Sequence, residues 1–251
     1  MTSTTIGLCV FACVFGAAAS AMLVRNSLPK HHLNADTKDL VKLAMGLVAT
    51  MAALVLGLLV ASAKGTHDAQ RSTVVQIAGK AAFLDRVLTL YGPGAAEARV
   101  LLRRALEEAI THIWPGNKSQ EAQLAPNTAS GEALYEAILK LAPQNDVQRS
   151  LKSQALAITS DLGQMRWLLF EQAGAVIATP LLVMVAFWLA ILFFSFGLFG
   201  PANTTAIGAL LVAALSVSGA IFLILELDQP FGGLIQISSQ PMRNALSHLA
   251  P

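Results

Sequence analysis

The sequence has no formally charged side chain between Glu171 and Glu226, a run of 54 residues. One crossing of a bilayer takes roughly 20 apolar residues, so this run is too long for one transmembrane helix and fits two. Turn-forming residues gather near its middle, at positions 200–205, where Pro and Gly end one helix and Asn and Thr begin the next. The run therefore predicts a hairpin of two transmembrane helices.

Charge is scarce in the chain as a whole, and so is cysteine. Charged residues make up 13% of the sequence and hydrophobic residues 55%, whereas soluble domains carry about 25% charged residues. The net charge of +2 gives no strong field for nucleic acid, which we do not expect as a partner. Cys9 and Cys13 share one helix face without His or carboxylate neighbours, so we interpret them as small packing residues and expect no metal site.

Catalytic sequence motifs are also missing. The chain contains no GxSxG, P-loop, HExxH, GxGxxG or CxxC pattern, which are signatures of common nucleophile, nucleotide and metal sites. Its carboxylates and histidines between the apolar runs occupy ordinary positions on predicted helix surfaces. We therefore expect neither an enzyme nor a protein with a bound cofactor.

Two further uncharged apolar stretches precede the long run, at 5–24 and 43–63, and each fits one membrane crossing. From residue 64 to the hairpin the chain is charged, and its apolar residues recur at helical spacing. This spacing predicts helices at 73–90, 95–113, 130–141 and 147–170. We expect an all-α membrane protein with four transmembrane helices and a helical soluble domain inserted between helices 2 and 3. The predicted divisions are transmembrane helices 1 and 2 (1–63), the soluble domain (64–170), the transmembrane hairpin (171–227) and a C-terminal tail (228–251).

Small residues recur at every fourth position on three of the predicted spans. They are Ala49, Ala53, Gly57 and Ala61 on the second span, Ala12, Gly16 and Ser20 on the first, and Thr205, Ala209 and Ala213 on the fourth. Such small-residue ladders allow helix backbones to approach closely in lipid. We favour packing within one chain, and packing between subunits is the alternative. One four-helix chain has too little interior for a pore, so transport would require several copies.

Polar residues at the predicted membrane edges are further candidates. His31 and His32 follow the first span, and a His pair can bind metal or respond to pH. Adjacent side chains point in different directions, so we favour interfacial polar residues over a ligand pair. Glu226 and Asp228 close the fourth span, where ionisable groups are either solvated or functional.

Two residues indicate where the chain enters the third span, but the side of the membrane is not set by charge. Arg166 and Trp167 are interpreted as interfacial anchors, because Trp and Arg are common at that depth. The loop after the first span holds four Lys and Arg residues and the opposite side five, which is no clear bias. The uncharged N-terminal stretch followed by Arg25 mildly favours an outward-facing soluble domain.

Four stretches, at 28–32, 56–62, 91–93 and 226–232, resemble a family of bacterial four-helix membrane proteins described as bestrophin-like, in order and spacing over nearly the whole chain. A more distant resemblance, to bestrophin anion channels, rests on residues 56–60 and on Pro230, Phe231 and Gly232. It implies a pentamer in the bacterial inner membrane that conducts small anions, with five second helices lining the pore and a cytoplasmic helical domain. The corresponding neck positions are Thr50, Leu54 and Leu58.

The chain departs from the bestrophin pattern in two places. Bestrophin necks carry aromatic residues, and here Leu54 and Leu58 stand instead. The acidic calcium-binding cluster after Pro-Phe-Gly is absent, because residues 233–239 contain no carboxylate, so we carry over no calcium site. The sequence thus favours a homo-oligomeric channel with the second helix lining the pore. The alternative is a membrane-anchored interaction or sensory module that acts through its helical soluble domain.

Overall fold

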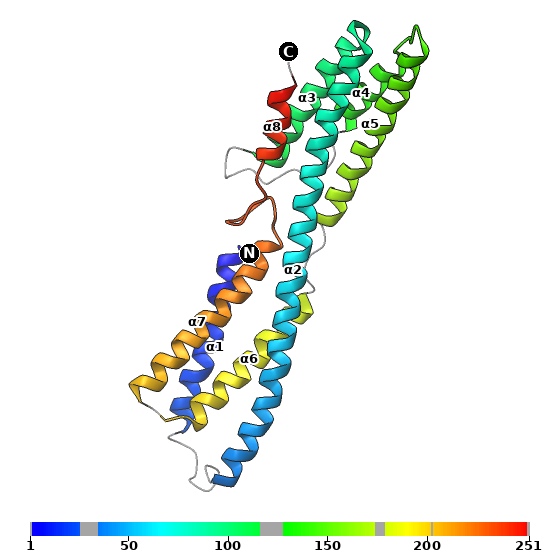
Figure 1. Ribbon diagram of the computed structural model, residues 1–251. Coiled ribbons are helices and arrows are strands. Elements are labelled where there is room, and N and C mark those ends of the chain that lie inside the picture. Colours follow the sequence, from blue (N-terminus) through cyan, green and yellow to red (C-terminus); the bar gives the residue numbers. More distant parts are fainter. Residues whose placement is uncertain (1, 26–34, 116–127, 174–178, 202, 250–251) are drawn as a thin grey trace. The chain divides into compact units, whose positions relative to one another are not determined.

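A computed structural model describes residues 2–25, 35–115, 128–173, 179–201 and 203–249 (Figure 1). Within these ranges all elements are helical and no strand occurs, so the all-α prediction is confirmed. The helices are α1 (Ser3–Arg25), α2 (Ala35–Tyr91), η2 (Pro93–Ala95), α3 (Ala96–Ile113), α4 (Thr128–Leu139), α5 (Asp146–Ala173), α6 (Thr179–Phe199), α7 (Thr204–Leu227) and α8 (Gln240–His248).

Four of these helices, α1, α2, α6 and α7, are long and apolar enough to cross a membrane, as the sequence predicted. Local sequence sets the ends of the hairpin helices. Pro180 lies in the first turn of α6, where a missing N–H costs nothing. Asn203 caps α7, since its side-chain oxygen accepts a hydrogen bond from the Ala206 backbone N–H at 2.8 Å.

Helix α2 is one continuous helix of 57 residues, about 85 Å long at 1.5 Å per residue. The sequence predicted a break at Lys64 between a transmembrane helix and a separate helix beginning near residue 73, and this prediction was wrong. The reason is that the intervening residues contain no proline. A single glycine, Gly65, weakens a helix but does not end it.

The chain divides into two compact units. Unit 1 comprises Met1–Gly65 and Val176–Asp228, and unit 2 comprises Thr66–Ala175 and Gln229–Pro251. The predicted divisions placed 228–251 in a tail of its own, whereas the structure groups these C-terminal residues with the helices that follow the second span. The insertion of a water-soluble domain at 64–170 stays a prediction.

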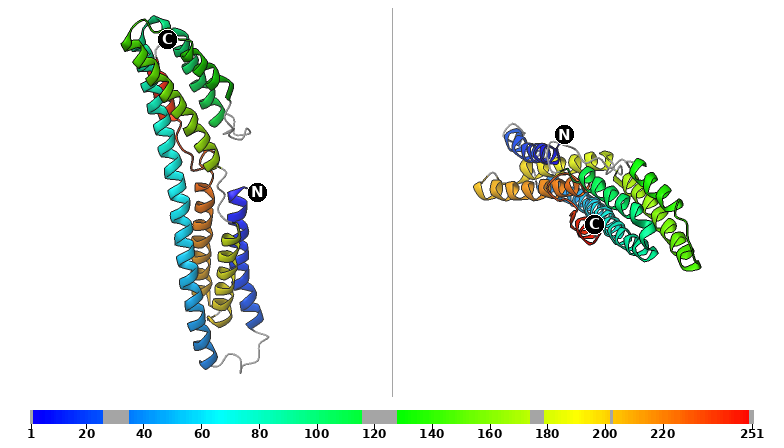
Figure 2. Two further views of the ribbon diagram at one scale, coloured as in Figure 1. Left: turned by 90° about the vertical axis from the view of Figure 1, so that its right-hand side faces the viewer. Right: turned by 90° about the horizontal axis from the view of Figure 1, so that it is seen from above.

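In unit 1, α1 lies alongside both α6 and α7 (Figure 2). The core between the transmembrane helices is filled by buried aliphatic and aromatic side chains, namely Val10, Val14, Ala18, Leu59, Ala63, Val185, Leu189, Phe193, Ala214, Ile221 and Ile224. Gly197 of α6 lies against the backbone of Ala18 of α1. A Cβ built on Gly197 would lie 3.0 Å from the Ala18 carbonyl carbon, and closer still to its oxygen, so only glycine fits.

In unit 2, apolar side chains of α2, α3, α4, α5 and α8 form a second core. An ion pair joins α2 to α3, with Arg99 Nε 2.7 Å from Asp85 Oδ1. Helix α8 was not predicted, although Pro241 at its start and the apolar residues Met242, Ala245 and Leu249 carry a helical signal. Those three side chains are buried in this core.

Trp114 holds the C-terminal segment of unit 2 in place. Its indole Nε1–H donates to the backbone carbonyl of Ile237 at 2.8 Å. Its ring packs edge-on against Phe231, with 5.7 Å between ring centroids. The segment after α7 is therefore fixed to the end of α3 by one hydrogen bond and one aromatic contact.

Replacing Trp114 with phenylalanine is expected to loosen this segment. The variant keeps a ring against Phe231 but leaves the Ile237 carbonyl without its donor, which costs about 1–3 kcal/mol. We expect faster amide hydrogen exchange across residues 229–249 and a lower melting temperature. Trp167→Phe is the control, because the Trp167 indole N–H has no acceptor among the residues the structure describes. Equal exchange in the two variants would contradict the prediction.

Candidate functional site

One face of α2 within unit 1 is exposed among the helices that the structure describes. The predicted neck residues lie on it: Thr50 is exposed, and the exposed fractions of Leu54 and Leu58 are 75% and 67%. The Thr50 hydroxyl donates to the Leu47 carbonyl one turn earlier at 2.8 Å, so it is satisfied within its own helix. We call Thr50, Leu54 and Leu58 the α2 stripe.

The small-residue ladder of α2 flanks this stripe. Ala53, Gly57 and Ala61 are exposed and Ala49 is half-buried. A Cβ added at Gly57 would meet nothing within 4 Å. The other two ladders, at 12–20 on α1 and 205–213 on α7, are exposed too. Most ladder residues are thus exposed within the described part of the chain, and packing within one chain, the interpretation favoured from the sequence, stays a prediction.

The opposite face of α2 points into unit 1. Ala52, Leu59 and Ala63 are buried, and Val55 and Leu56 pack against the same core. Since this interior is filled by side chains, the inward face of α2 does not line a path through a single chain. Any conduction path along α2 would run over its exposed face.

The remaining membrane-edge candidates fall in different environments. His31 and His32 lie outside the described residues. Glu226 is buried, with 4% of its surface exposed, and Asp228 is half-buried. Both residues make further interactions within the chain. This arrangement favours a structural role for the end of α7.

The Pro-Phe-Gly segment is a folded turn. The Gly232 N–H donates to the Gln229 carbonyl at 3.1 Å, and the Ile237 N–H donates to the Pro230 carbonyl at 2.7 Å. Phe231 is buried against Trp114 and so belongs to the core of unit 2 instead of a polar site. In the described part of the chain, no three His, Cys, Asp or Glu residues gather in a way that could hold a metal ion.

The two cysteines also differ from their predicted role. Cys9 and Cys13 of α1 are both exposed, whereas the core of unit 1 is built from Val10, Val14 and Ala18 on another face of the same helix. The spacing correctly placed the two thiols on one side of α1. It did not show which side of that helix packs against α6 and α7.

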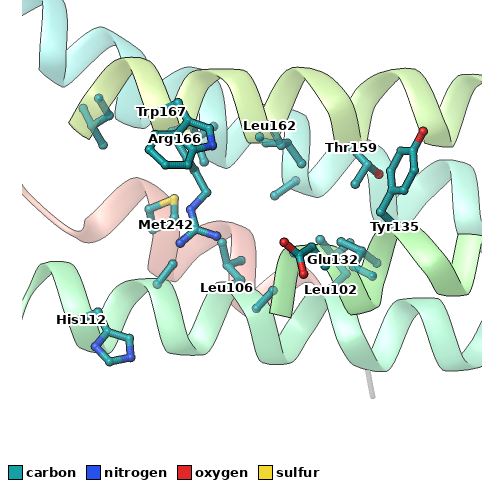
Figure 3. A pocket seen from close by; sticks show the side chains of 18 of the residues that line it. Leu102, Leu106, His112, Glu132, Tyr135, Thr159, Leu162, Arg166, Trp167 and Met242 are labelled. Atoms are coloured by element: carbon teal, nitrogen blue, oxygen red, sulfur yellow. The ribbon is translucent and has the colours of Figure 1, made fainter. Parts of the chain in front are cut away.

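Unit 2 contains a second feature, an apolar cavity of about 540 Å³ between α3, α4 and α5 (Figure 3). Arg166 and Trp167, predicted as interfacial anchors, both line it. The Arg166 side chain extends from α5 toward Leu106 of α3 and Met242 of α8. The sequence alone did not reveal this cavity, because its walls come from helices far apart in the chain.

The chain is thus an α-helical, multi-pass membrane protein. Its second transmembrane helix continues into a helical unit that includes the C-terminal residues. The sequence model of the Bestrophin-like domain matches residues 12–242. The chain therefore belongs to the Bestrophin-like domain family, as its short sequence stretches suggested. A comparison with curated proteins found no match.

Proposed function

We propose that this protein is a homo-oligomeric ion channel in which the α2 stripe faces the conduction path. The observation that carries the proposal is the uncovered face of α2, where large apolar side chains stand beside a ladder of small residues. The ladder allows the second helices of neighbouring subunits to approach closely. Leu54 and Leu58 would then form an apolar constriction that gates by losing its water. The distant likeness to bestrophins suggests five subunits and small anions.

Gly57 offers a direct test of assembly. The wild-type protein in mild detergent is expected to be an oligomer, and Gly57→Leu is expected to weaken subunit association about tenfold or more, because the leucine keeps neighbouring backbones apart. Gly208→Leu on α7 is the matched control, since a Cβ there is equally free of neighbours within 4 Å and the proposal places α2, not α7, between subunits. Analytical ultracentrifugation measures both. A wild-type monomer, or equal dissociation of the two variants, contradicts the proposal.

Conduction is tested separately with purified protein in planar bilayers. We expect wild-type current, and a larger current from Leu54→Ala and Leu58→Ala because smaller side chains hold water in the constriction more readily. The reversal potential across a KCl gradient reports whether anions or cations pass. Silence of the wild type and of both variants in every salt counts against a channel.

The alternative function, an interaction or sensory module, is favoured by a different outcome. A stable wild-type monomer that conducts no ions but retains a specific soluble partner through unit 2 would support it. The bait for that experiment is the full-length chain, because unit 2 includes residues from both sides of the transmembrane hairpin.

A further inference from the structure

The cavity of unit 2 has the dimensions and walls of a small-molecule site. All of its lining residues belong to unit 2, and most are apolar. Its volume of about 540 Å³ lies within the roughly 300–1,000 Å³ of typical ligand pockets, which combine hydrophobic walls with a few placed polar groups. Side chains of α2, α3, α4, α5 and α8 line it, so the cavity forms only when these helices pack together.

Arg166 is the one arginine among the residues that line the cavity. Burial lowers the pKa of Arg166, and the negative charge of Glu108 partly opposes this shift. The guanidinium stays ionised even so, because arginine does not lose its proton in proteins. It has neither an ion-pair nor a hydrogen-bond partner among the residues that the structure describes. A partly desolvated guanidinium without acceptors is unfavourable, and a bound anion would satisfy it.

The nearby carboxylates are committed elsewhere or lie at the rim. Glu108 is paired with Arg104 at 3.1 Å, and Glu136 is 3.5 Å from Lys140. Glu132 of α4 points into the cavity in Figure 3 but remains exposed. Arg166 beside two exposed rim carboxylates, Glu132 and Glu136, disfavours a ligand with several negative charges. This lining leaves room for a head group with one negative charge.

We propose that this cavity binds a single-chain carboxylate amphiphile, with the carboxylate on Arg166 and the hydrocarbon tail against the apolar walls formed by α3, α4 and α5. A carboxylate matches the planar guanidinium, which can donate two parallel hydrogen bonds to its two oxygens. The tail replaces water along walls that include Leu102, Leu106 and Leu162. The proposal stands apart from conduction along α2, because every residue it uses is in unit 2.

Binding is measured with bromododecanoate and the full-length protein in lipid nanodiscs. Trp167 lines the cavity with 51% of its surface exposed, so a bound brominated chain is expected to quench its fluorescence. Trp167→Phe supplies the background, which includes quenching of Trp188 by probe dissolved in the bilayer. The difference between the two proteins should saturate with one probe per chain. Identical quenching in both proteins overturns the proposal.

Competition with unbrominated compounds defines the ligand class. Dodecanoate is expected to compete at least about tenfold better than dodecanol, because only the carboxylate makes charge-assisted hydrogen bonds. Each methylene removed from the tail should weaken binding by up to about fourfold. Equal competition by dodecanol, or preference for dodecyltrimethylammonium, overturns the proposal, the latter by showing that Glu132 holds the head group.

Variants test the two halves of the site. Arg166→Gln is expected to lower dodecanoate affinity about tenfold or more, whereas Arg149→Gln, an exposed position on the same helix, is expected to change nothing. Glu132→Gln should strengthen binding by removing a like charge. Gly163 lines the cavity, and a Cβ there meets nothing within 4 Å, so Gly163→Leu is expected to occupy part of the cavity. It should block binding while keeping or raising the melting temperature.

The lipid composition of the bilayer distinguishes a free amphiphile from a bilayer lipid as the source of the ligand. Nanodiscs with and without an anionic phospholipid are compared. If the phospholipid leaves dodecanoate affinity unchanged, the site takes a free carboxylate amphiphile. Competition by the phospholipid would identify a bilayer lipid and overturn the assignment of a carboxylate head group. Unchanged dodecanoate binding in both Arg166→Gln and Gly163→Leu would overturn the site itself.

Discussion

Gly197→Ala is expected to abolish the folded state of unit 1. The new methyl group would meet the backbone of Ala18 on α1, with the Ala18 Cα 3.1 Å away. A side-chain neighbour could rotate aside, but a helix backbone cannot. Overpacking in a well-packed core costs about 1–3 kcal/mol and sometimes more. Because α1 and α6 would have to separate along their contact, we expect Gly197→Ala to lower the free energy of unfolding by at least about 3 kcal/mol.

The comparison is Gly208→Ala on α7, where the new methyl group meets nothing within 4 Å. This control is expected to keep wild-type yield and melting temperature, while Gly197→Ala should give aggregated material on size exclusion. Both variants make the same chemical change within transmembrane helices of unit 1. A well-folded Gly197→Ala protein would show that α1 and α6 are not packed as described.

Leu88→Ala is expected to destabilise unit 2 strongly. Leu88 is fully buried, with 0% of its surface exposed, in the core of unit 2. Removing three carbon atoms there loses their burial and leaves a cavity, a combination that costs about 2–5 kcal/mol. The loss of stability is measured by denaturant unfolding of the full-length protein, monitored through amide hydrogen exchange in α2 and α3.

Leu90 provides an internal control two residues further along the same helix. Its side chain is 58% exposed, and exposed substitutions usually change stability by no more than about 0.5 kcal/mol. Leu90→Ala should therefore unfold close to wild type. If both variants lost equal stability, the burial pattern of α2 in unit 2 would be incorrect.

The transmembrane helices were predictable because a long stretch without charge is a local signal that depends on no partner. The same local reasoning placed the break between α6 and α7 at residues 200–205, where Asn203 caps α7. It failed at Lys64, where charge returns but no residue breaks the helix. Local composition thus predicted which helices are long and apolar enough to span a membrane better than where a helix ends.

Packing partners were not predictable, because they join distant segments. A four-residue ladder of small side chains shows that close contact is possible but not which face of a helix meets a neighbour. The close contact between Ala18 and Gly197 joins positions 179 residues apart and follows from no repeat in either helix. Arg166 was placed at a membrane edge by its position before an apolar run. Its cavity depends on α3, α4 and α8.

Synthesis of unit 2 is interrupted by the last two transmembrane helices. A ribosome finishes residues 66–175 first and must then make α6 and α7 before the remaining part of unit 2 emerges. Until residues 229–249 are made, Trp114 lacks its hydrogen-bond acceptor, the Ile237 carbonyl. The α8 side chains that complete the core next to α3 are absent as well. A nascent chain that stops at Asp228 has all four helices that are long and apolar enough to span a membrane in the described part of the chain, yet the core of unit 2 is still incomplete.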